Sequence, residues 1–121
     1  MLPFNVTENG VLIIRLRADL DIAGRAAAAW AIDGYLAAHR SAPVMLELSD
    51  APLSNAAVST VVRTRRMCRS AGAPLAVVAA TAETRRALEA QTMAEGLTVR
   101  PTRRLAAAAL SAASAPVAAA A

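Results

Sequence analysis

The chain has 121 residues and a formal charge of +4 that comes from arginine alone, because the sequence contains no lysine. This length predicts one small domain, and with one phenylalanine, one tryptophan and one tyrosine its core must consist of aliphatic side chains and alanine. The basic groups lack interleaved aromatic residues, which argues against nucleic-acid binding, and the single cysteine, Cys68, excludes an intramolecular disulfide and a cysteine zinc cluster.

Neither end of the sequence predicts export or a membrane span. Asn5, Glu8 and Asn9 interrupt the N-terminal region before an export signal's apolar run could form. The apolar segment 105–121 is mostly alanine and contains Pro116, which disfavours a span. With a single cysteine, these features predict a cytoplasmic protein without a membrane partner.

The N-terminal part predicts a β-hairpin followed by a helix. Strands are expected at 4–6 and 11–17, joined by a turn at 8–10, and the helix at 22–40 begins after Asp19 or Asp21 as N-cap. We expect Trp30 at the boundary of the core. The inner stripe of this helix is expected to be Ile22, Ala26, Ala29, Ile32 and Leu36.

The central part predicts a buried strand at 44–48, a polar loop, and a helix from Asn55 to Ala71 that ends at Gly72. Ser54 or Asn55 is the expected N-cap. Free backbone N–H groups and the positive end of the helix dipole meet at such a join, so it suits an anion or a partner's carboxylate. Four polar residues share one predicted face of this helix: Asn55, Ser59, Arg63 and Arg66.

The C-terminal part continues the alternation of strands and helices. Strands are expected at 75–79 and 97–100, a helix at 82–93 capped by Thr81, and a last helix after Thr102. This order predicts an α/β fold with a mixed, mostly parallel sheet of four to five strands. We expect one domain over 1–113 and a flexible alanine-rich tail over 114–121.

The sequence carries no recognisable catalytic constellation. His39 has no nucleophile or metal partner at a suitable spacing, and Cys68 lies on a predicted apolar helix face, as a small core residue would. Glycine-rich phosphate loops and clusters of metal ligands are absent from the sequence. We therefore predict no enzymatic activity, no cofactor and no metal site.

The order of elements and two short motifs give the chain a resemblance to a known family. Ala18-Asp19-Leu20-Asp21 after the second strand, and Met45 to Ala51 before the central loop, resemble the STAS domain of the anti-sigma factor antagonist type. The family's first motif is Gly-x-Leu-Asp, which matches here except at the glycine. Its strand motif ends Leu-Asp-Leu-Ser, and this chain has Glu47 in place of the motif's aspartate.

The resemblance also implies a regulatory loop, Asp-Ser-Ser/Thr-Gly-Leu, in which a partner kinase phosphorylates the serine after the aspartate. An alignment through Val58 places Asn55 at that position, whereas an ungapped extension of the strand places Ala56 there. Neither side chain has a hydroxyl, so this switch is predicted to be absent. Ser54 and Ser59 remain hydroxyl-bearing neighbours outside the acceptor position.

These observations predict a non-enzymatic interaction module that binds an anti-sigma factor or a related kinase-like regulator without phosphorylation. Two alternatives stay open: a nucleotide or small-anion sensor, and a structural component of a larger assembly, with a possible homodimer. The predicted partner-binding residues are Asp21, Ser54, Asn55, Ala56, Ser59, Arg63 and Arg66.

Overall fold

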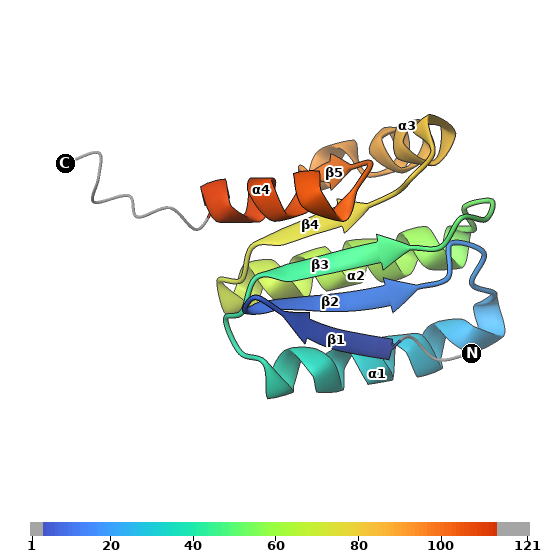
Figure 1. Cartoon of the computed structure of the whole chain (residues 1–121). Helices are drawn as coiled ribbons and strands as arrows, with labels where there is room; N and C mark the ends of the chain where they lie inside the picture. The colour runs from blue at the N-terminus through green and yellow to red at the C-terminus, as the bar shows by residue number, and fades with distance from the viewer. Residues whose placement is uncertain (1–3, 114–121) are drawn as a thin grey trace.

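The strands form one sheet whose spatial order, β1-β2-β3-β4-β5, follows the chain in the computed structural model, which describes residues 4–113 (Figure 1). β1 pairs antiparallel with β2, and the other neighbours pair parallel. The predicted mixed, mostly parallel sheet is therefore confirmed. The strands are β1 (Phe4–Glu8), β2 (Val11–Leu16), β3 (Val44–Leu48), β4 (Leu75–Val78) and β5 (Val99–Arg100).

The helices cover the two faces of the sheet unequally. In Figure 1, α1 and α2 lie behind the sheet, whereas α4 lies in front of it. The main contacts between α4 and the sheet are with β3, β4 and β5, and Ile13 of β2 also packs with Ala106 and Leu110 of this helix. The helices are α1 (Ile22–Ala38), α2 (Asn55–Ala71), α3 (Ala82–Gln91), the 3-10 turn η1 (Met93–Glu95) and α4 (Arg103–Ala113).

Alternation along β3 divides the core into two clusters. Leu46 and Leu48 belong to the larger cluster with residues of α1 and α2, whereas Met45 packs with Ala106 and Leu110 of α4. Parallel strands buried on both faces are expected to be largely apolar, and β3 and β4 are so except at Glu47. Both helix layers are therefore held by aliphatic packing.

Glu47 is the polar exception on the α4 side of β3. Its carboxylate accepts two hydrogen bonds from Arg103 of α4, at 2.7 and 2.8 Å, and pairs with Arg15 of β2 at 2.9 Å. The hydrogen bonds from Arg103 lower the pKa of Glu47 against the opposing effect of desolvation. Glu47, which stands at the aspartate position of the Leu-Asp-Leu-Ser motif, thus anchors α4 to the sheet.

The prediction for the buried face of α1 was correct for Ile32, which is buried, and for Leu36, which packs against the core, but wrong for Ile22 and Ala26, which are exposed. Ile22 and Trp30 are 78% and 77% exposed, and the buried residues are Ala28, Ala31 and Ile32. Alanine occupies so many positions of α1 that apolar spacing does not point to one face. Ile32 was placed correctly, but Trp30 is not at the core boundary.

The helix ends follow local capping signals. Gly72 closes α2 with φ +72°, a left-handed conformation that glycine adopts without strain, and Thr81 accepts a hydrogen bond from the Thr84 N–H. α3 ends two residues earlier than predicted, and η1 leads to Gly96. The expected tail at 114–121 lies outside the described residues, and among residues 4–113 none of the helices has the length and apolarity that a bilayer span requires.

Candidate functional site

The loops before α1 and α2 are hydrogen-bonded to each other where β2 and β3 end. The Ser49 hydroxyl accepts from the Ala18 N–H at 2.9 Å, and the Ser54 N–H donates to the Ala18 carbonyl at 2.8 Å. The Ser54 hydroxyl donates to the Leu20 carbonyl. Two helix N-termini are thereby fixed next to each other at one edge of the sheet.

Each helix begins at a side-chain N-cap, which decides between the alternatives that the sequence left open. The Ser54 hydroxyl accepts from the Ala57 N–H at 3.1 Å and so caps α2, whereas Asn55 is the first residue of the helix. Asp21 caps α1 through the Gly24 N–H at 2.7 Å. Asp19, the other candidate cap, pairs with Arg17 at 2.9 Å.

Most of the predicted partner-binding residues reach the surface together. Asn55, Ser59, Arg63 and Arg66 are exposed along one face of α2, as predicted, and Asp21 is exposed beside its N-terminus. Ser54 is half-buried. Ala56 is 4% exposed and belongs to the core, so its side chain is not part of this surface.

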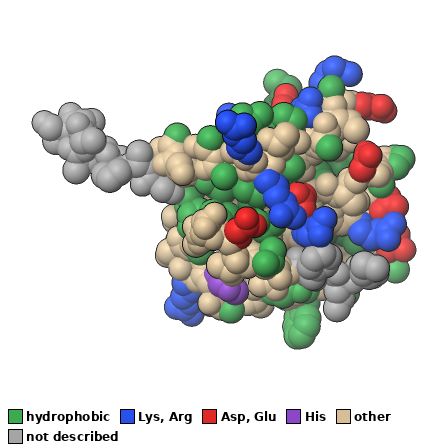
Figure 2. Space-filling model, viewed as in Figure 1, with side chains coloured by type: hydrophobic (Ala, Val, Ile, Leu, Met, Phe, Trp, Pro, Cys, Tyr) green, Lys and Arg blue, Asp and Glu red, His purple; other side chains and the backbone are tan. Residues whose placement is uncertain are grey.

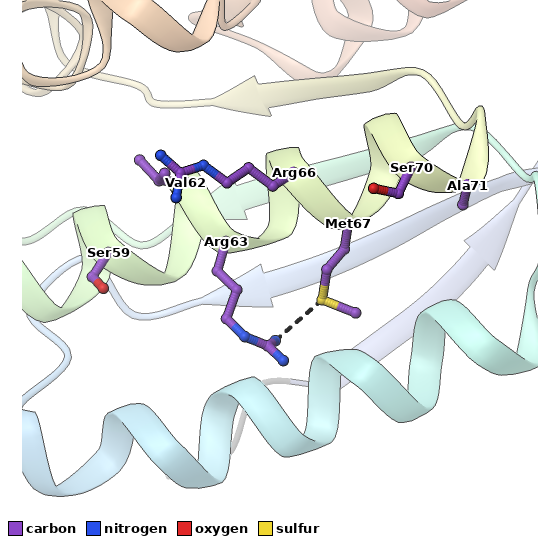
Figure 3. Close-up of a pocket in the computed structure, with 7 residues that line it drawn as sticks. All are labelled: Ser59, Val62, Arg63, Arg66, Met67, Ser70 and Ala71. Atoms are coloured by element: carbon purple, nitrogen blue, oxygen red, sulfur yellow. Dashed lines mark hydrogen bonds between the residues drawn. The ribbon is translucent and has the colours of Figure 1, made fainter.

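Arg63 is tied to α1 (Figure 3). Its guanidinium points toward α1 and makes a bidentate ion pair with the carboxylate of Asp33, in which one hydrogen bond measures 2.9 Å. A further contact joins the guanidinium to the sulfur of Met67 at 3.1 Å. The hydrogen bond from Arg63 lowers the pKa of Asp33. The charge of Arg63 is therefore already balanced.

Arg66 is tied to η1 on the opposite side. It pairs with the Glu95 carboxylate at 2.8 Å, and this hydrogen bond is the main cause of the lowered pKa of Glu95. The Glu95 carbonyl also accepts from Arg65 and Arg69, at 3.2 and 2.9 Å. Arg65 thus carries its charge outward from the apolar side of α2.

An open hollow of about 800 Å³ lies along α2 between these two tethers. Figure 3 shows its lining, in which Arg63 and Arg66 point to different sides of the helix. The lining residues are Ser59, Val62, Arg63, Arg66, Met67, Ser70 and Ala71.

Sequence reasoning missed Asp33 and Glu95 as parts of this surface. Each lies about thirty positions from its arginine, Asp33 at a separation of 30 and Glu95 at 29. No local spacing signals a pair at that distance. Only the packing of α1 and η1 against α2 brings these carboxylates to the arginines.

Cys68 and His39, which could in principle act in catalysis, make contacts that are typical of structural residues. Cys68 is buried, and burial raises the pKa of its thiol to about 11, so the thiol is protonated at neutral pH. A ring nitrogen of His39 lies 2.9 Å from the Tyr35 carbonyl at the end of α1. Over the described part of the chain, no group of three or more His, Cys, Asp or Glu residues is placed to hold a metal ion.

Comparison with known proteins identifies the family. The sequence matches the STAS domain family over residues 5–106, which is most of the chain. The chain belongs to the STAS domain family. A comparison with curated proteins finds no match. The fold is similar to the NMR structure of the protein TM1081, at a TM-score of 0.72 and 18% identity over 88% of this chain and 86% of that one.

Membership of the STAS family confirms the resemblance that the motifs at 18–21 and 45–51 suggested. At the level of the family it supports a regulatory, anti-sigma-factor-antagonist-like interaction module, and STAS domains are generally non-enzymatic.

Proposed function

We propose that this STAS domain binds an anti-sigma factor or a related kinase-like regulator through Asp21, Ser54 and the exposed face of α2, without a phosphorylation switch. The observation that carries the proposal is the first turn of α2. Asn55 offers an exposed amide there, directly after a Ser54 hydroxyl that is engaged in the fold. The surface therefore offers an amide for hydrogen bonds to a partner, but no free hydroxyl at the position of the family's phosphoacceptor.

Accessibility distinguishes the two alignments of the family's phosphoacceptor. Asn55 is exposed, whereas Ala56 is 4% exposed and faces the core. Only the first position can present a side chain to another protein. An asparagine amide both donates and accepts hydrogen bonds but takes no phosphoryl group, which favours binding that does not depend on ATP.

The charge of this surface favours a polar or acidic contact over a free small anion. The first turn of α2 contains no acidic residue, so its backbone N–H groups and dipole attract a partner's carboxylate. The arginines that would hold a nucleotide, Arg63 and Arg66, are each paired with a carboxylate of the same chain. The anion-sensor alternative therefore receives less support than a protein partner.

The binding surface is tested by pull-down with the full chain as bait, comparing the unaltered protein with Asn55→Asp. A new carboxylate should repel an acidic contact and weaken capture of the partner, while it should raise helix stability by about 0.3–1 kcal/mol through the N-terminal dipole. Loss of capture by a more stable protein cannot come from unfolding. Equal capture by both proteins would place the interface elsewhere.

Asn9→Asp is the matched control. It makes the same asparagine-to-aspartate change in the exposed turn before β2, at the opposite end of that strand from the loop before α2, and should leave capture unchanged.

The absence of a phospho-switch is tested with the captured regulator and ATP. Mass spectrometry should find peptides spanning Asn55 unmodified, whereas Asn55→Ser restores an exposed hydroxyl and becomes a substrate if the regulator is a kinase. Ala56→Ser should remain unmodified because this position is buried. Phosphate on the unaltered chain at Ser54 or Ser59 would contradict the proposal.

A further inference from the structure

The outer face of α1 is apolar along its whole length. Nine residues of this helix are exposed, and Arg25 is the only one among them with a polar side chain. Arg25 lies about 140° around the helix from Trp30, on the flank of the face. The other exposed residues are Ile22, Ala23, Ala26, Ala27, Trp30, Gly34, Ala37 and Ala38.

A helix on the surface of a lone domain is expected to present polar residues to water, as α2 does. On α1, however, Trp30 and Ile22 are more than three-quarters exposed. Hydrophobic side chains protrude at the lower edge of the molecule in Figure 2, under the position that α1 has in Figure 1. An exposed apolar strip that contains the only tryptophan has the character of an interaction surface.

From this strip we infer that α1 packs antiparallel against α1 of a second copy of this chain. Trp30 is the middle residue of the helix, so a two-fold axis beside it brings the two N-terminal halves onto the two C-terminal halves. Ile22 then faces Ala37 and Ala38 of the second copy. At each end of the contact the bulky Ile22 meets small alanines, and at its centre the two Trp30 side chains pack against each other.

The charges at the two ends of α1 favour the antiparallel arrangement. Asp21 precedes the helix and Arg40 follows it, and both are exposed. Antiparallel packing places Asp21 of each copy near Arg40 of the other, and it also opposes the two helix dipoles. Parallel packing would bring like charges together, so the charge pattern fits a second copy in one orientation only.

The size of the strip predicts a weak, reversible dimer. A helix of 17 residues is about 25 Å long, and a strip one helix wide covers a few hundred Å². Stable complexes bury about 800 Å² on each partner. The dimer should therefore form only toward high protein concentration.

Sedimentation equilibrium of the full chain from about 10 µM to about 1 mM should show the mass rising from one chain toward two. Trp30 reports the same event, because its fluorescence should shift to shorter wavelength as the ring leaves water. Trp30→Glu should remain monomeric over this range. Met93→Glu, the matched control, changes an 82% exposed apolar residue of η1 and should dimerise like the unaltered chain.

A charge exchange tests the orientation. Arg40→Glu alone and Asp21→Arg alone each place like charges together at both ends and should remain monomeric. An equimolar mixture restores opposite charges at both ends and should dimerise. If the unaltered chain stays monomeric, the inference is overturned, and the strip would instead contact another protein or a lipid surface. The inference is also overturned if the equimolar mixture fails to dimerise or if Trp30→Glu dimerises.

Discussion

Replacing Ser54 by alanine should destabilise the domain by about 2 kcal/mol, although it removes a single oxygen atom. The hydroxyl accepts from the Ala57 N–H as the cap of α2, a role worth about 1 kcal/mol. It also donates to the Leu20 carbonyl, and removal of that donor leaves a part-buried acceptor unpaired at about 1 kcal/mol more. For a domain of this size the sum lowers Tm by about 6–12 °C.

Urea unfolding followed by circular dichroism measures this change. Ser59→Ala is the matched control, because Ser59 is exposed on the same helix and caps nothing, so the substitution should be neutral or stabilising by a few tenths of a kcal/mol. Ser54→Thr keeps both hydrogen-bonding functions and should retain most of the stability. A loss below about 0.5 kcal/mol for Ser54→Ala would refute the assignment of both roles to this hydroxyl.

Three further outcomes follow from the paired and buried groups. Because Arg103 lowers the pKa of Glu47, this carboxylate stabilises the fold above its unfolded pKa of about 4.5 and loses that effect as the pH falls through the lower folded value. The free energy of unfolding, measured with urea, should therefore fall from about pH 7 to about pH 3 by up to about 1 kcal/mol more for the unaltered chain than for Glu47→Gln. The difference is this small because solvent screens the 41% exposed arginine. Cys68 should not react with a thiol reagent at about pH 8 until urea exposes it, since its pKa is about 11. Nucleotides should not raise Tm, because Arg63 and Arg66 are already paired; a saturable increase would revive the anion-sensor alternative.

Signals that act over a few residues predicted most of the fold. Strands at 11–17 and 44–48 carry long aliphatic runs, and the structure places β2 and β3 within them. The helix ends were predictable because Ser54 and Gly72 act on backbone groups within four positions. α2 was predicted best because its polar and apolar residues separate around the helix.

The rest depended on contacts between segments that are distant in sequence. Glu47 and Arg103 are 56 positions apart, and nothing in either neighbourhood indicates that α4 packs over β3. The buried face of α1 was mispredicted in part for a different reason. Alanine fits both a core and a close helix contact, so spacing alone could not tell the buried face from the apolar face that contains Ile22 and Trp30.

The two proposed surfaces differ in chemistry but meet at Asp21, which caps α1 beside the start of α2. If both are used, a second copy on α1 and a regulator on α2 exclude each other there, and by linkage each weakens binding of the other to the same degree. Trp30→Glu, which leaves the α2 face unchanged, should then capture the regulator at least as well as the unaltered chain, with the largest gain at high protein concentration. Weaker capture by this variant would mean that the regulator itself contacts the apolar face of α1.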